Sequence, residues 1–251
     1  MSGHSKWSSI KHKKGALDAK RGKLFAVLTR QIEVAARAGG GDPASNATLR
    51  TMIQKARDAS LPVDNIQRAI KRGIGEEEGV IYEAINYEGY APSGVAVYVQ
   101  CLTDNRNRTG SEIKNLFSKN GGSFAEPGAV AWQFDRKGVV MVVKTAIEED
   151  DLLLMAADAG AEDIGDAGDD WVVTTPAAEL HAVRTAIEAA GIAVKSSDLT
   201  MIPSTSVGID TEASAKSVLR LVDILEDHDD VEAVYANFDI SEELLSLVLG
   251  A

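Results

Sequence analysis

The hydrophobic pattern of this 251-residue chain changes near residue 76. Before that point apolar residues follow one another at spacings of seven, four, four and three, at Leu17, Leu24, Leu28, Ile32 and Ala35, as on the buried face of a helix. After it, segments 82–87 and 95–102 are rich in β-branched and aromatic residues, which favour strands. The pattern predicts a helical domain followed by α+β structure, and thus an α+β, multidomain protein.

The helical domain is predicted at residues 1–76 and contains three helices. The first spans 16–38 and ends at the glycines 39–41, because glycine is common just after a helix. Asp42 before Pro43 is predicted to start the second helix as a capping residue before a first-turn proline, and the third runs from Pro62 to Gly73. Residues 2–15 are too polar to pack, so we expect a mobile arm there.

The rest of the chain is predicted to hold two α/β domains, one inserted in the other. Strands at 139–144, 170–175 and 192–196 alternate with helices at 148–159 and 177–190, an order that suits a split β-α-β, ferredoxin-like domain at 136–204. A strand at 199–204, a helix at 212–225 and a strand at 231–238 then complete the sheet that begins at Tyr82. The middle domain would therefore consist of 77–135 and 205–251, interrupted by an acidic inserted domain.

Charge is distributed unevenly along the chain. Residues 1–75 hold 15 Lys or Arg against 5 Asp or Glu, a net charge of +10, whereas residues 76–251 hold 11 against 33, a net charge of -22. A dense positive region on an acidic protein suggests a polyanion partner that contacts one end of the molecule. The alternative is that the lysines only form a solvated surface.

The sequence lacks the residue patterns that several classes of function require. No apolar run is long enough to span a bilayer, and a single cysteine, Cys101, cannot form an internal disulfide, so we expect a cytoplasmic protein. The glycines at 73 and 75 lack the partners of a phosphate-binding loop, and the four histidines do not form a zinc ligand set. We therefore predict no enzyme activity, no cofactor, no metal, no small-molecule substrate and no membrane partner.

The segment Asp104–Thr109, with the sequence DNRNRT, lies between a predicted strand and a predicted helix. Arg106 and Arg108 could bind an anion there, helped by the unpaired amides at the start of the helix. The alternative is that Asn and Asp form the turn and the arginines pair with nearby acids.

A set of motifs in the chain resembles the YebC/PmpR family, which also includes the mitochondrial translational activator of cytochrome c oxidase. The motifs are GHSKW at 3–7, IKHKKG at 10–15, DAKRGKLF at 18–25, AARAGGGDP at 35–43, DNIQRAIKRG at 64–73, YEGYAPSGVA at 87–96, LTDNRNRT at 102–109, FSKNGG at 117–122 and FDRKGV at 134–139. The resemblance implies a helical N-terminal domain, two α+β domains and a non-enzymatic regulator. Members are described as probable transcriptional regulators that bind DNA, and others are similar to ribosome-associated factors that assist translation of proline runs.

Three hypotheses follow. The first is a DNA-binding regulator of transcription; the alternative is a translation factor that binds ribosomal RNA on the ribosome; the third is a pure protein-interaction module. In the first two, His4 is an additional stacking or hydrogen-bonding group, and the predicted nucleic-acid-binding residues are Lys6, Trp7, Lys11, His12, Lys13, Lys14, Lys20, Arg21, Lys23, Arg68, Lys71 and Arg72.

Overall fold

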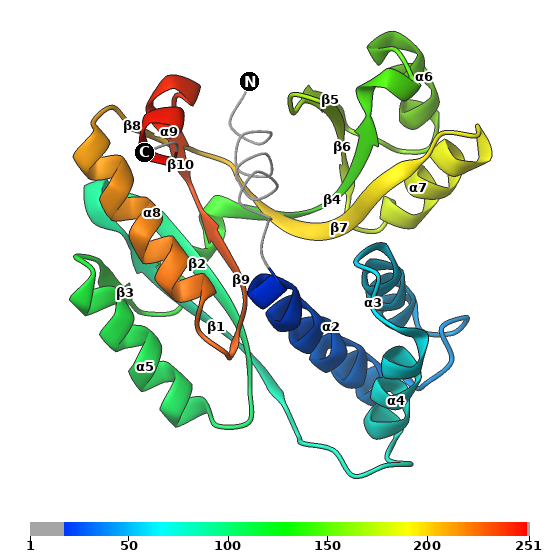
Figure 1. The fold of residues 1–251 in the computed structure, drawn as a ribbon, viewed down its shortest axis with the longest axis horizontal. Coiled ribbons are helices and arrows are strands. Elements are labelled where there is room, and N and C mark those ends of the chain that lie inside the picture. Colours follow the sequence, from blue (N-terminus) through cyan, green and yellow to red (C-terminus); the bar gives the residue numbers. More distant parts are fainter. Residues whose placement is uncertain (1–17, 250–251) are drawn as a thin grey trace. The chain divides into compact units, whose positions relative to one another are not determined.

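The computed structural model describes residues 18–249, with side chains from 22 to 248. The described residues form two compact units: 18–80 with 136–200, and 81–135 with 201–249 (Figure 1). Helices and antiparallel sheets together confirm the α+β, multidomain class. The predicted domain boundaries at 76, 135 and 204 stay a prediction. Among the described residues, no helix has the length and apolar character needed to cross a bilayer.

Three helices open the first unit: α2 (Asp18–Gly39), α3 (Ala47–Asp58) and α4 (Val63–Ile74). Their apolar faces form one core that includes Leu28, Ile32, Leu49 and Ile66. Helix α2 packs closely on α4 at Gly73, where an added Cβ would lie 2.4 Å from the Glu33 carbonyl oxygen. A glycine is therefore required at this crossing.

The predicted start of the second helix was wrong. Asp42 instead closes a tight turn, with its Oδ1 accepting from the Ala44 amide at 2.9 Å, and α3 begins after Asn46. The buried Asn46 side chain accepts from the Leu49 amide and donates to the carbonyls of Ala35 and Gly40. One amide thus caps α3 and also satisfies carbonyls near the end of α2, which a carboxylate at this position could not do.

The second part of this unit is a four-stranded sheet with two helices. Its elements are β4 (Phe134–Val143), α6 (Glu149–Asp158), β5 (Asp163–Asp166), β6 (Asp170–Pro176), α7 (Leu180–Ala189) and β7 (Val194–Pro203), with a short 3-10 helix η3 (Lys144–Ala146) after β4. The strand order β5-β6-β4-β7 is that of the predicted split β-α-β fold. The core contains Val140, Leu152, Val183 and Ile187.

Two strand assignments differ from the sequence prediction. Residues 163–166 form strand β5, although the acidic run from Glu162 to Asp170 is typical of a turn; the strand lies at the sheet edge, where acids face solvent. The strands predicted at 192–196 and 199–204 are one continuous strand, β7.

The second unit is built on the sheet β3-β1-β2-β9. Its strands are β1 (Glu83–Tyr90), β2 (Ala96–Thr103), β3 (Ser123–Ala125) and β9 (Val231–Ala236); the 3-10 helix η1 (Pro92–Gly94) joins β1 to β2, and η2 (Ala131–Gln133) precedes β4. Helices α5 (Arg106–Lys119) and α8 (Glu212–Glu226) contact each other and pack on this sheet (Figure 1). A small parallel pair, β8 (Val207–Ile209) and β10 (Phe238–Ile240), and the unpredicted helix α9 (Glu242–Leu249) complete the unit.

Candidate nucleic-acid interface

Most of the predicted arm lies outside the described residues: His4, Lys6, Trp7, Lys11, His12, Lys13 and Lys14. Lys20 and Arg21 belong to α2, ahead of the first described side chain, and Lys23 is a half-buried residue of the same helix. The basic side chains that the structure describes in this region lie further along α2 and in α3 and α4.

Arg72 is engaged in the packing of α2 on α4. Its Nε lies 3.1 Å from Oε2 of Glu33, a carboxylate that is only 3% exposed, and Arg37 approaches the other oxygen of the same group at 3.5 Å. A buried carboxylate needs such partners, since an unpaired one is costly. Arg72 therefore has a structural role, whatever else it contacts.

Arg68 and Lys71, by contrast, are exposed on α4. Arg68 donates to the Asn65 side chain at 2.6 Å, and within the described part of the chain neither residue forms an ion pair with a carboxylate. Arg57, in the last turn of α3, is exposed and unpaired in the same sense, and sequence reasoning missed it. Arg57 lies outside the apolar stripe formed by Leu49, Ile53 and Ala56, and this pattern in the sequence already indicates an exposed side chain.

Arg106 and Arg108 lie in the first turn of α5, which is capped by Asn105, so the helix begins inside the segment that was expected to precede it. Arg108 donates to Asp230 at 2.7 Å and to Asp104 at 2.9 Å, whereas Arg106 is exposed, with its Nη1 3.5 Å from Glu83. The hydrogen bond to Asp230 raises the pKa of Arg108. For Arg108 the structure thus matches the alternative in which the arginine pairs with nearby acids.

Asp230 gathers several donors at the start of α5. It is 7% exposed, and its Oδ2 accepts from Thr109 at 2.6 Å, from Thr103 at 3.2 Å and from Arg108. Burial alone would raise the pKa of this carboxyl, but these hydrogen bonds and the charge of Arg108 hold the pKa below its usual value. Asp230 is therefore a charged anchor that joins β9 to α5.

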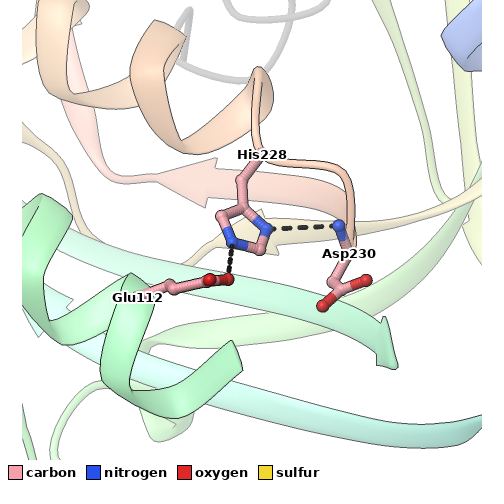
Figure 2. A group of neighbouring side chains, drawn as sticks. All are labelled: Glu112, His228 and Asp230. Atoms are coloured by element: carbon pink, nitrogen blue, oxygen red, sulfur yellow. Dashed lines mark hydrogen bonds and ion pairs between the residues drawn. The ribbon is translucent and has the colours of Figure 1, made fainter. Parts of the chain in front are cut away.

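Figure 2 shows Asp230 beside His228 and Glu112, whose ligand atoms lie within 4.8 Å of one another, a grouping that could hold a metal ion. The Asp230 amide donates to Nδ1 of His228 at 3.1 Å, which leaves the ring proton on Nε2, 2.9 Å from Glu112. Because the imidazole nitrogens and Oδ2 of Asp230 already have partners, the chemistry of this group is that of a hydrogen-bonded network.

Comparison with known proteins places these features in a family. Residues 5–76 match the family described as "TACO1/YebC protein N-terminal domain", and residues 82–238 match "TACO1/YebC second and third domain". A "probable transcriptional regulatory protein" of Rubrobacter xylanophilus is 57% identical over 251 residues, covering 100% of both chains. One of Salinispora arenicola is 53% identical over 247 residues, covering 98% of this chain and 99% of the relative.

A solved structure shares the fold. It is the crystal structure of a conserved hypothetical protein from Aquifex aeolicus, which is 45% identical and superposes with a TM-score of 0.82 over 91% of this chain and 94% of its own.

Proposed function

Because the chain belongs to the TACO1/YebC family, we propose that it is a non-enzymatic, cytoplasmic regulator of gene expression that binds nucleic acid through its basic N-terminal region. The observation that carries the proposal is the charge of +10 on residues 1–75 against -22 on the remainder. Phosphate contacts supply most of the affinity of nonspecific nucleic-acid binding, and the acidic remainder repels the same ligand. Binding is thus confined to the helical end of the chain.

Helices α3 and α4 favour DNA as the ligand. Four residues, 59–62, join them, which is the connection length of helix-turn-helix motifs. The exposed side chains Gln67, Arg68 and Lys71 follow one another on one side of α4, at positions i, i+1 and i+4. We propose that Arg57, Arg68 and Lys71 contact phosphates and that the lysines of the arm extend this contact.

A second candidate function is binding of ribosomal RNA during translation. The observation that favours it is the placing of Trp7, with His4 and His12, among the lysines of the arm. An indole can stack on an unpaired base, which double-stranded DNA does not offer and folded RNA does. In this case the protein would assist ribosomes on difficult sequences such as proline runs, as the family resemblance implies.

The first test is binding to a DNA duplex and to a single-stranded RNA between 50 and 200 mM salt, followed by fluorescence anisotropy. If about six phosphates are contacted, affinity should fall about a thousandfold over this range. A variant with Lys6, Lys11, Lys13 and Lys14 changed to Gln should lose about four units of the salt slope, and Lys71→Gln about one. Lys119→Gln and Lys216→Gln, outside the N-terminal region, are the controls. A salt-insensitive complex would contradict the proposal.

The two candidate functions separate in a second experiment, which follows the intact chain and the Lys-to-Gln variant through sucrose gradients of translating extract. Co-sedimentation of the intact chain alone with ribosomes supports the RNA function. Absence from the ribosome peaks, combined with salt-dependent DNA binding, supports the transcriptional function. Replacing Trp7 by Ala should weaken RNA binding by about 1 to 3 kcal/mol if the indole stacks on a base.

A further inference from the structure

A groove of about 400 Å³ lies in the second unit, whereas the residues assigned above to nucleic acid belong to the first. The residues that line it come from β1, at Ile85 to Glu88, from α5, at Arg106, Gly110 and Lys114, and from β3, at Phe124. Gly110 lets α5 lie close to Tyr87, because an added Cβ would be only 3.2 Å from the Tyr87 hydroxyl oxygen.

The groove follows an open edge of the sheet. Strand β1 pairs with β2 along its whole length, from Glu83 to Tyr90, but on its other side β3 pairs only with Glu88, Gly89 and Tyr90. Within the described part of the chain, no strand covers residues 83–87 on that side. Ile85 and Tyr87 point to one face of the sheet and Asn86 and Glu88 to the other, so a groove lined by all four runs along the edge itself.

An uncovered strand edge presents backbone donors and acceptors to any extended chain that enters the groove. Strand addition uses these groups for affinity and takes specificity from side chains beside the edge. Five residues, 83–87, are enough for a short added strand, which would continue the line of β3 past Ala125, where Pro127 turns the chain away.

The charged side chains beside the open edge of β1 determine which kind of partner can bind there. Lys114 is exposed, and among the described residues it has no carboxylate within ion-pair distance. Arg106 shares only a long contact with the exposed Glu83. The charge of Glu88 is not offered to a ligand, because its buried carboxylate accepts from the amides of Gly128, Val130 and Ala131 at 2.7 to 2.8 Å. The groove is therefore cationic.

Aromatic groups in the groove do not favour a nucleic acid. The Tyr87 ring is buried and Phe124 is half-buried, with its ring packed against Tyr87 at 5.8 Å and against Phe117 at 6.2 Å. Tyr87 is only 8% exposed, so its ring offers no free face of the kind that stacks on a base. We propose that the β1 edge binds an extended, acidic segment of a partner protein by strand addition, a protein-binding site in addition to the proposed nucleic-acid interface.

The test uses the full chain labelled with ¹⁵N and a capped eight-residue peptide of alternating valine and glutamate. Titration should shift the amide resonances of residues 83–88 and 106–114. Lys114→Glu should weaken this binding at least tenfold, because a repulsive charge replaces an attractive one, and Ser111→Trp should weaken it by filling the groove. Lys119→Glu reverses a charge on the same helix outside the groove and should leave the affinity unchanged. All three positions are exposed, so the spectrum also verifies that each variant is folded.

Three results would overturn the proposal. In the first, the peptide shifts only resonances elsewhere, such as those of the basic N-terminal region. In the second, Lys114→Glu does not weaken the binding of the peptide. In the third, an oligouridine shifts residues 83–88 as strongly as the peptide and loses this effect in Lys114→Glu, which would make the groove a nucleic-acid surface.

Discussion

At the scale of single residues, Asp230 connects parts of the second unit that are far apart in sequence. Arg108 and Thr109 lie more than 120 positions before it, yet both donate to its Oδ2. The hydroxyls of Thr103 and Thr109 belong to fully buried residues, so removal of the acceptor charge leaves them poorly satisfied. The contribution of Asp230 is thus stability rather than ligand binding.

Asp230→Asn should lower the free energy of unfolding of the second unit by about 2 kcal/mol at pH 7, the size expected for hydrogen bonds to a charged group. Because the folded-state pKa is lowered, this contribution is present above the usual Asp value of 3.8 and is lost as the pH falls through the folded-state pKa. Urea unfolding followed by the amide resonances of the second unit at several pH values is the measurement.

The difference between the natural chain and Asp230→Asn should therefore shrink in acid. Asp104→Asn is the matched control, because Asp104 pairs with the same arginine from an exposed position and should contribute less than about 1 kcal/mol. A pH-independent loss in Asp230→Asn would show that its charge is not the source of stability.

At the scale of elements, Arg184 joins α7 to α3 and β7 within the first unit. It is 8% exposed; its Nη1 donates to Asp58 and to Ser197, each at 2.7 Å, and its Nε to Glu188 at 2.9 Å. Lys55 of α3 adds a second link, to Asp198 at 2.8 Å. The three-helix segment and the β4–β7 sheet are therefore connected by ion pairs of which one is buried.

Arg184→Met should destabilise the first unit by about 3 kcal/mol, since it leaves Asp58 without its cationic partner. Asp58→Ala in the Arg184→Met background should cost less than in the natural chain, which a double-mutant cycle measures as a coupling energy. Trp171, in β6, reports unfolding of this unit. His181→Ala, at an exposed position of α7, serves as the control, and additive effects of the two substitutions would contradict a direct link.

Elements with a long, regular pattern could be predicted from sequence, and those defined by their neighbours could not. The helices predicted at 16–38, 62–73 and 212–225 correspond to α2, α4 and α8 to within a few residues, and the order of elements in 136–204 indicated the split β-α-β fold. Strand β5 was missed because acidic residues such as Asp163 and Asp166 are more typical of turns than of strands. They form a strand here because β6 supplies the hydrogen-bonding partners beside them. The role of Asn46 was missed because it depends on α2 ending next to it.

The sites follow the same rule. Clustering of lysines near the N-terminus is visible in sequence, so a polyanion partner could be proposed from it. Arg106 and Arg108 were proposed together as an anion clamp, but only the fold reveals that Asp230 pairs with one of them. The groove beside β1 could not be predicted from sequence. It exists because β3 pairs with β1 only at Glu88, Gly89 and Tyr90, and this register is set by the fold.

At the scale of the whole molecule, the chain passes between the two units at residues 80–81, 135–136 and 200–201. Strand β4 leaves the second unit and β7 returns to it, and these strands are neighbours in one sheet. Residues 136–200, which interrupt the second unit, are called the insert. Near its two ends, the Ser204 amide donates to the Gln133 carbonyl at 2.8 Å. The segment 136–200 therefore leaves and re-enters the second unit through adjacent strands.

Replacing residues 136–200 by a four-residue glycine-serine linker should leave the second unit folded, because its ends are already in contact and its core residues Phe134, Tyr98 and Tyr235 remain. Circular dichroism and Trp132 fluorescence should show one cooperative thermal transition. A further variant that also ends after Ile209 lacks α8 and β9 and should lose the transition. Absence of the transition in the first variant would mean that the second unit depends on the insert for stability.

The adjacency of β4 and β7 also bears on chain entropy. An unstructured loop costs about 0.6 kcal/mol more for each doubling of its length, so closing the 65 residues from 136 to 200 should cost about 2 kcal/mol more than closing four. Once the insert has formed its own core, β4 and β7 hold residues 135 and 201 near each other, and this difference disappears. A folded segment 136–200 then delays the pairing of the β3-β1-β2-β9 sheet no more than a short turn would. The natural chain and the linker variant should therefore refold their second units at similar rates.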